Sequence, residues 1–466
     1  HHTDIGQPKI TGNTEFRSED QSYHLQAGGY NIWFGRDEFQ YAYNKIKGDF
    51  ILTGNFSFKG SGADPHRKTG WMVRADGSED AAHMSATVHG DGLVAMQWRR
   101  MKGAHMRDPQ DELFTKKSGT QIIQLERLGG VFIMRVAHPG EPLQEVGRTK
   151  EIDMPDEVLA GIFLSSHHAE AKEEAMAWNL RMEKTVPDDY NGYRDGILGS
   201  RLEVMNVFDG KRKIIHEDSG RFEAPNWTRD GKLLFNQGGH IYSIPETGGQ
   251  PVQINTGVAK RNNNDHVISM DGKWLAISSH RDGLPGGGST IYYLPITGGE
   301  PKLVTDSTPS YLHGWSPNGK ELVYTAQRLS RQQAYNIYRI SINGGKETQL
   351  TFLEKGLADG PEYSPDGKWI YYNSTESGTM QIWRMKPDGS GKEQISFDEH
   401  NNWFPHISPD GKWIVFLSFP NTVAPGDHPF YKRVMLRLMP AGGGAPRVIA
   451  YMFGGQGTIN TPSWSP

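Results

Sequence analysis

Carboxylic acids and histidines recur in the C-terminal half of this 466-residue chain, a few residues ahead of a repeated turn. Paired carboxyl groups can act as proton donor and base at a glycosidic bond, and histidine exchanges a proton near neutral pH. The candidate catalytic groups are Glu223, Asp265, Asp359, Glu362 and His406.

Amide, aromatic and further imidazole side chains accompany these acids. Amides and carboxylates bind sugar hydroxyls, and aromatic rings cover the apolar face of a pyranose, so the pattern favours an oligosaccharide or polysaccharide ligand. The candidate substrate-binding residues are Asn264, His266, Tyr311, His313, Asn401, Asn402, Trp403, Gln456 and Asn460. The competing interpretation is that Asn and Asp close loops through local backbone hydrogen bonds.

A divalent metal is a further option, because the histidines at 266, 313 and 406 could bind one together with Gln456. A metal would acidify a sugar proton for elimination or activate water for hydrolysis. The chain has no Gly-x-Ser-x-Gly elbow, phosphate-binding loop or His-Glu-x-x-His motif that would select one chemistry. The metal ligands therefore stay open.

A repeat positions these residues. Residues 363–369 (YSPDGKW) and 407–413 (ISPDGKW) place hydrophobic side chains on both sides of a turn that Pro, Asp and Gly favour. Weaker copies put turn glycines at 231, 272 and 319, ahead of those at 367 and 411. The resulting spacings of 41, 47, 48 and 44 residues match one four-stranded propeller blade per repeat.

The repeat also aligns the strand that precedes each turn. Eight residues before the turn glycines lie Glu223, Asn264, Tyr311, Asp359 and Trp403, with Asn460 added by extension. A purely structural column would repeat small or aliphatic residues, whereas this column varies in charge and hydrogen-bonding type. We therefore expect these strands to line a central channel with a functional site at its mouth.

A second turn recurs in each repeat, as at 247–249 (TGG) and 297–299 (TGG). The two turns together resemble the Tol-type propeller repeat, as in the C-terminal domain of TolB proteins. The resemblance implies a six-bladed β-propeller over residues 200–466, closed where residues 461–466 (TPSWSP) restart the repeat and complete the blade begun by 201–216. Propellers of this type serve as protein-docking platforms, as gating domains of prolyl peptidases and as oligogalacturonate lyases.

Short runs with alternating polarity, such as 50–58 (FILTGNFSF), fill residues 23–183 and predict a sandwich of two antiparallel sheets. The runs 33–37 (WFGRD), 70–74 (GWMVR) and 161–166 (GIFLSS) resemble concanavalin A-like lectin/glucanase sandwiches, which implies a jelly-roll fold and sugar binding. Aromatic residues that could stack on a sugar, or else fill the core, are Trp33, Tyr41, Trp71 and Trp98. The polar residues 1–22 predict an N-terminal arm, and 184–199 a linker.

Composition narrows the partners. The net charge of −4 and the absence of a basic block argue against a nucleic acid, and no apolar run predicts a transmembrane segment. The lack of cysteine excludes disulfides and thiol chemistry and fits a periplasmic or secreted protein. A signal peptide would not be visible, because the sequence starts at His1-His2-Thr3.

The sequence therefore predicts an all-β protein, a sandwich followed by a propeller, that binds a glycan at the propeller mouth. Cleavage, by a glycoside hydrolase or polysaccharide lyase mechanism, is an open extension of this hypothesis. The alternative is a noncatalytic docking platform that accepts a protein partner.

Overall fold

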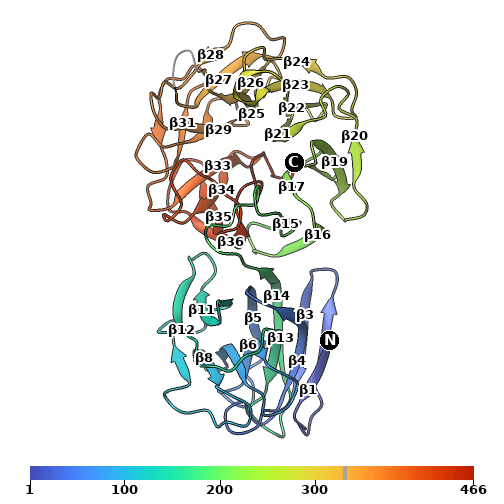
Figure 1. Ribbon diagram of the computed structural model, residues 1–466, viewed down its shortest axis with the longest axis vertical. Coiled ribbons are helices and arrows are strands. Elements are labelled where there is room, and N and C mark those ends of the chain that lie inside the picture. The colour runs from blue at the N-terminus through green and yellow to red at the C-terminus, as the bar shows by residue number, and fades with distance from the viewer. Residues whose placement is uncertain (329–332) are drawn as a thin grey trace. The chain divides into compact units, whose positions relative to one another are not determined.

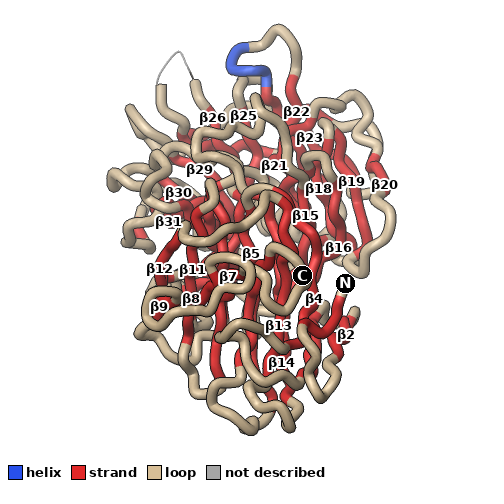
Figure 2. The backbone as a smooth tube through the Cα atoms, turned by 60° about the horizontal axis from the view of Figure 1, so that its bottom comes forward, coloured by secondary structure: helices blue, strands red, loops and turns tan. Residues whose placement is uncertain are grey.

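The computed structural model describes residues 1–328 and 333–466, and strands make up almost all of its regular structure (Figure 2). Within these residues the only helical element is the short 3-10 segment η1, Pro285–Gly288. The chain forms two compact units: His1–Pro187 with Met205–Lys213, and Asp188–Val204 with Ile214–Pro466. Each unit is described separately.

The first unit contains two seven-stranded sheets. In one sheet the order is β1 (His2–Ile5), β4 (Phe39–Lys47), β13 (Glu157–Ser165), β6 (Lys68–Arg74), β7 (His83–His89), β8 (Val94–Arg99) and β9 (Glu112–Phe114). In the other it is β12 (Gln144–Thr149), β11 (Val131–Ala137), β10 (Ile122–Leu128), β5 (Phe50–Lys59), β14 (Glu173–Lys184), β3 (Ser22–Ala27) and β2 (Asn13–Arg17).

One hydrophobic core joins these two sheets. Trp71 and Met84 from the first sheet and Phe56, Leu125 and Phe132 from the second belong to the same buried cluster. Along β6, β7 and β8 alternate residues enter this core, and the residues between them are buried on the other face of the sheet. The concanavalin A-like and jelly-roll assignments remain predictions.

Three of the four aromatic residues considered for sugar stacking are core residues instead. Trp71 and Trp98 pack in the shared core, and the Trp71 Nε1–H donates to the Ile123 carbonyl over 3.1 Å. Tyr41 is fully buried and donates its hydroxyl to the Met72 and Leu159 carbonyls. Trp33 alone remains half-buried.

The first 22 residues are not an irregular arm. Strand β1 pairs antiparallel with β4, from His2 opposite Ala42 to Ile5 opposite Phe39, and β2 pairs with β3. Both lie at the ends of their sheets, where backbone hydrogen bonds to one neighbour suffice and no apolar alternation is required. The sequence therefore showed no strand pattern there.

The second unit contains five four-stranded sheets, the blades of a propeller, whose inner strands gather around its centre (Figure 1). The first blade contains β17 (Phe222–Trp227), β18 (Lys232–Gln237), β19 (His240–Pro245) and β20 (Val252–Ile254). The second contains β21 (Asn262–Ile268), β22 (Trp274–His280), β23 (Ser289–Pro295) and β24 (Lys302–Leu303). The third contains β25 (Ser310–Trp315), β26 (Glu321–Ala326), β27 (Asn336–Ser341) and β28 (Thr348–Gln349). The fourth contains β29 (Ala358–Tyr363), β30 (Ile370–Ser374), β31 (Gln381–Met385) and β32 (Glu393–Gln394). The fifth contains β33 (Asn401–Ile407), β34 (Trp413–Phe419), β35 (Lys432–Pro440) and β36 (Arg447–Gly454).

The repeated turn is closed by side chains. In residues 363–369, the Ser364 hydroxyl donates to Asp366 over 2.7 Å and accepts from the Trp369 N–H over 3.0 Å. Gly367 has φ +71°, the left-handed conformation that a glycine adopts without strain. Ser408 and Asp410 form the same bond over 2.6 Å in the last blade, so the sequence repeat is a repeat of this turn.

Of the six predicted blades, five are present as four-stranded sheets in the described residues. β15 (Ser200–Met205) and β16 (Arg212–Asp218) form a separate two-stranded sheet, and residues 461–466 form no strand. That segment lies between the first and last blades, since Asn226 donates to the Pro462 carbonyl over 2.6 Å and Trp464 to the His406 carbonyl over 2.8 Å. Its contacts run through side chains, and a continuous strand ladder is not formed.

Candidate functional site

Every inner strand carries a β-bulge where the sequence predicts channel-lining residues. The strand register shifts within Glu223–Asn226, Asn262–His266, Leu312–Gly314, Asp359–Glu362 and Trp403–His406. A bulge leaves a residue out of the hydrogen-bond ladder and re-aims its neighbours. Positive φ values of +60° at Ala224 and +53° at Phe404 mark two of these bulges, and both residues are unusual there because they carry a Cβ.

Four ionisable side chains meet at the propeller centre and are called the central cluster here: Glu223, Asp265, His313 and Asp359. They come from the neighbouring strands β17, β21, β25 and β29, and each is less than 10% exposed. The His313 Nε2 lies 3.1 Å from an Asp359 carboxylate oxygen. Such a concentration of buried charge is costly and is a mark of functional sites.

Asp359 and His313 form an ion pair at neutral pH. Burial alone would raise the pKa of Asp359, but the adjacent His313 outweighs it and lowers that pKa to about 2. Burial alone would lower the pKa of His313, but the carboxylates of Asp359 and Asp265 raise it to about 9. The imidazole is therefore a cation and the Asp359 carboxyl an anion across the physiological range.

Asp265 behaves differently from Asp359. Burial is the main cause that raises the pKa of Asp265 to about 7; the charge of His313 opposes this shift, and the carboxylates of Asp359 and Glu223 add to it. At neutral pH this carboxyl group can therefore hold a proton and release it. Two aspartates in one cluster thus differ in protonation, which is the arrangement required of an acid and its ionised partner.

Glu223 supplies a second carboxyl group with a raised pKa, for which burial is responsible, while the Arg221 guanidinium opposes the shift. The Arg221 Nε lies 3.7 Å from Glu223 Oε1, and that oxygen has no hydrogen-bond partner among the described residues. The backbone at Gly457 packs directly on this side chain, since a Cβ there would lie 2.6 Å from the Glu223 Cγ. One oxygen of Glu223 is therefore free to accept a ligand hydrogen bond.

Glu362 and His406, predicted as catalytic, form a separate pair. The His406 Nδ1 lies 2.6 Å from Glu362, and its Nε2 donates to the Ile459 carbonyl. The other Glu362 oxygen accepts from the Ile407 N–H over 3.3 Å. Both ring nitrogens are thus occupied by contacts that tie β29, β33 and the C-terminal segment together, so the structure gives this pair a stabilising position.

Three predicted ligand contacts in β33 are also occupied by the fold. Asn401 accepts from the Met380 N–H and donates to the Val423 carbonyl. Asn402 donates to Gln381 and accepts from Arg437 over 2.6 Å. Trp403 is fully buried. The position of these residues at the start of β33 was a sequence signal for this structural role, because a side chain at the start of a strand can form a hydrogen bond with a neighbouring strand.

The remaining predicted residues differ in burial and in their hydrogen bonds within the protein. His266 is fully buried without a hydrogen-bond partner in the described residues, and burial lowers its pKa to about 4, so it is neutral. Asn460 is used locally, where its Oδ1 accepts from the Gly457 N–H over 2.9 Å. Tyr311 and Gln456 are half-buried, and Asn264 is 9% exposed. Burial is the main cause of the raised pKa of Tyr311, and the charges of Asp265 and Asp359 add to it. Tyr311 therefore adjoins the central cluster.

The sequence analysis missed an aromatic group next to Glu223. The Arg221 guanidinium lies over the rings of Tyr193 and Phe430, at 5.0 and 5.8 Å from their centroids. Tyr193 belongs to the segment 184–199 predicted as a linker, and residues 188–199 of this segment are part of the propeller unit. Two tyrosines among its Pro, Gly and Asp residues were the available signal.

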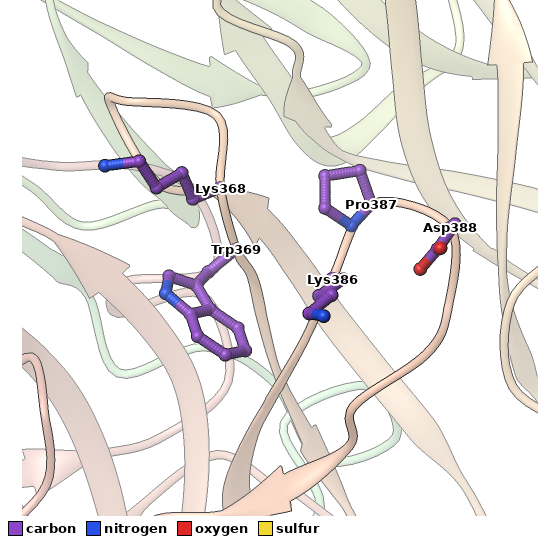
Figure 3. A pocket seen from close by; sticks show the side chains of 5 residues that line it. All are labelled: Lys368, Trp369, Lys386, Pro387 and Asp388. Atoms are coloured by element: carbon purple, nitrogen blue, oxygen red, sulfur yellow. The ribbon is translucent and has the colours of Figure 1, made fainter.

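No group of three or more His, Asp or Glu side chains within residues 1–328 and 333–466 is arranged to hold a metal ion. A hollow of about 480 Å³ on the fourth blade is lined by Lys368, Trp369, Lys386, Pro387 and Asp388 (Figure 3). Its lining comes from two surface turns and contains no residue of the central cluster. Within the described residues, no helix is long and apolar enough to cross a membrane.

Known proteins resemble the propeller part of the chain. The TolB beta propeller domain family matches residues 314–424. The uncharacterized protein Atu1656 of Agrobacterium fabrum is 46% identical over 273 residues, which are 58% of this chain and 90% of that protein. A solved TolB-type structure from Agrobacterium tumefaciens is 44% identical, with a TM-score of 0.54 over 58% of this chain and 95% of that one. The Tol-Pal system protein TolB of Anaeromyxobacter dehalogenans is 29% identical over 104 residues, 22% of each chain.

Proposed function

Since this chain belongs to the family of TolB-like β-propeller proteins, we propose that its function resides at the propeller centre, where it binds a glycan and cleaves it by acid–base chemistry. Proteins with this architecture use the centre of the ring, where several blades contribute side chains to one site. The proposal rests on the central cluster and not on any activity of a relative.

The observation that carries the proposal is the split between two buried carboxyl groups, with pKa values of about 7 for Asp265 and about 2 for Asp359. Asp265 would donate a proton to the glycosidic oxygen. Glu223, whose Oε1 lies 3.7 Å from the Arg221 Nε and has no hydrogen-bond partner in the described part of the chain, would in its ionised form attack the sugar or activate water. The His313 cation, held by Asp359 at 3.1 Å, would stabilise negative charge nearby.

Recognition of a glycan is supported by what surrounds these acids. Tyr311 offers a half-buried ring, while Asn264 and Gln456 offer amide groups. A hydrolase is favoured over a polysaccharide lyase, because a protonated carboxyl beside a second carboxyl is the arrangement that glycoside hydrolysis uses.

Finer features of the fold and location belong to the same proposal. We propose that β15, β16 and residues 461–466 form a sixth, incomplete blade, since the C-terminal segment bonds both to β17 and to β33. A concanavalin A-like fold for the first unit and a periplasmic or secreted location complete the proposal. The Tol-Pal name of one relative and the absence of cysteine agree with the location.

The second candidate is a noncatalytic docking platform, favoured by the name of the Anaeromyxobacter relative, a Tol-Pal system protein. In that case the central cluster would bind a polar segment of a partner protein and no covalent bond would change. The two candidates differ in turnover, which a direct assay detects.

The test is product formation from neutral and uronate-containing oligosaccharides, followed by reducing-end release and mass spectrometry. We expect Asp265→Asn and Glu223→Gln to lower the rate by about 100-fold or more, as removal of a general acid or base does. Asp282→Asn is the matched control, because this carboxyl is 90% exposed. Turnover that survives both cluster substitutions, or no turnover of any glycan, would contradict the proposal, and products with an unsaturated uronate would identify a lyase.

A further inference from the structure

Arg221 is the cation that lies beside Glu223. It directly precedes β17, whose second residue is Glu223, and its Nε is 3.7 Å from Glu223 Oε1. No other lysine or arginine within residues 1–328 and 333–466 lies within ion-pair distance of this carboxyl group. The Arg221 side chain is 40% exposed, and an exposed arginine that is free to move contributes little to a carboxylate. Its effect on Glu223 therefore depends on what holds the guanidinium in place.

Two aromatic rings hold the Arg221 guanidinium. It lies over the rings of Tyr193 and Phe430, and these two rings pack edge to face with their centroids 5.0 Å apart. A cation is attracted to the face of an aromatic ring, which favours one position of a long side chain over the many that it could take in solvent. Tyr193 comes from residues 188–199, called the strap here, and Phe430 from the loop that precedes β35. Three segments that are far apart in the sequence therefore meet at Arg221.

The strap has the local structure that is needed to present Tyr193. The Asn191 Oδ1 accepts from the Tyr193 N–H over 2.9 Å, and the Asn191 N–H donates to Asp195 over 2.9 Å, so a compact turn surrounds the tyrosine. After this turn, the Leu198 N–H donates to the Tyr431 hydroxyl over 2.8 Å, which ties the strap to the loop before β35. Tyr193 itself is 68% exposed, so its ring can be replaced without opening the core.

We propose that Arg221 is a positioning residue of the central site: held by the strap, it keeps Glu223 in the carboxylate form. The inference rests on the function proposed above, in which Glu223 attacks the sugar or activates water while Asp265 keeps the proton that it donates. When the strap is displaced, the guanidinium is free to move into solvent and Glu223 takes up a proton. The strap therefore decides whether the site has its base.

The charges around Glu223 agree with this role of Arg221. Burial raises the pKa of Glu223, and the Arg221 guanidinium opposes the shift. The other ionisable groups that respond to the charge of Glu223 are the carboxyl group of Asp265 and the hydroxyls of Tyr193 and Tyr431. An ionised Asp265 repels the Glu223 carboxylate, and the two phenols are neutral at neutral pH. Arg221 is therefore the group that supplies the opposing positive charge.

The test is a pH titration of the full chain, labelled with 13C at the glutamate carboxyl carbons, with the Glu223 signal assigned by its absence in Glu223→Gln. Arg221→Gln should raise the pKa of Glu223 by about 1, the lower end of the range for one close opposite charge, because Arg221 is partly exposed. Tyr193→Leu should raise it by about 0.5, because the guanidinium keeps its charge but loses a ring, whereas Tyr193→Phe keeps the ring and should leave it unchanged. Arg229→Gln is the matched control, because this arginine lies in the turn of the same blade and donates to the Met270 carbonyl.

Both Arg221 and Tyr193 lie at the surface, so their variants retain the fold. A rise of less than about 0.3 in Arg221→Gln, an equal rise in Arg229→Gln, or equal effects of Tyr193→Leu and Tyr193→Phe would overturn the proposal. The titration needs no substrate, so the control of Glu223 by Arg221 can be established even in a protein that cleaves no glycan. If a glycan is cleaved, the acid limb of kcat/KM against pH should move up by the same amount in Arg221→Gln. An acid limb that stays in place would reject the role of Arg221 and leave the proposed cleavage intact.

Discussion

Replacement of Asp359 by asparagine tests the charge state of the central cluster directly. The His313 Nε2 lies 3.1 Å from Asp359, and the pKa of this histidine is raised from 6.5 to about 9. That difference corresponds to about 3 kcal/mol in favour of the imidazolium at 1.36 kcal/mol per pKa unit. In Asp359→Asn the ion pair is lost while burial still disfavours the cation. Asp265 remains and favours it, so we expect the pKa to fall by about 1 to 2 units, the range for loss of one close opposite charge.

The assay is NMR titration of histidine-labelled full-length protein, with the His313 signal assigned by its absence in His313→Gln. Asp366→Asn is the matched control, because it removes a carboxylate from the turn of the same blade and should leave the pKa of His313 unchanged. A His313 pKa near 6.5 in the wild type, or a fall of less than about half a unit in Asp359→Asn, would refute the ion pair as the source of the shift.

The same pair predicts how stability depends on pH. A histidine whose pKa is raised in the folded state stabilises fully below its unfolded value of about 6.5 and loses this contribution as pH rises through about 9. Urea unfolding should therefore show the largest difference between wild type and Asp359→Asn near pH 6. By about pH 9.5 the difference should have largely disappeared. A difference that grows with pH would contradict the assignment.

Two further predictions concern packing and buried charge. Gly457→Ala should lower the free energy of unfolding of the propeller by about 1–3 kcal/mol, because the added Cβ would lie 2.6 Å from the Glu223 Cγ and φ is +86°. Gly411→Ala is the control, since its φ is +71° but no atom lies within 4 Å of the added Cβ. It should lower the free energy of unfolding by less in the same urea titration. Asp37→Asn should destabilise the first unit by about 3–5 kcal/mol, because this carboxylate is fully buried against two buried arginines. Exposed Asp76→Asn, compared by circular dichroism during urea unfolding, should change stability by less than about 1 kcal/mol.

The propeller could be predicted from the sequence because its repeat records a local event. The Ser, Asp and Gly of residues 364–367 each make a bond or adopt a dihedral angle that needs no distant partner. Counting back from the turn glycine also identified positions on the inner strands, since the distance along one strand is fixed, but the bulges at these positions were not predicted. The sixth blade stays a prediction, because it depends on how residues 461–466 pair with segments far away in the sequence. The strands β1 and β2 were missed for the same reason, because their partners hold them and their own pattern does not.

The site was predicted in part, and the residues that failed show why. Glu362 and His406 have the right side chains for catalysis, but their hydrogen bonds to each other, to Ile407 and to Ile459 are set by neighbouring strands. Asn401 and Asn402 are bound to the outer parts of the blade in the same way. Residue type therefore identified which side chains are chemically able to act on or bind a ligand. Only the hydrogen bonds of the folded chain show which of them are not already used by the fold.

His266 and His313 show how strongly neighbours decide the chemistry of a repeated position. Both lie six residues before a turn glycine, on adjacent inner strands, and both are buried. Burial lowers the pKa of His266 to about 4, whereas the carboxylates beside His313 raise its pKa to about 9. The propeller supplies equivalent backbone positions, and the acids on β21 and β29 convert one of them into a cation.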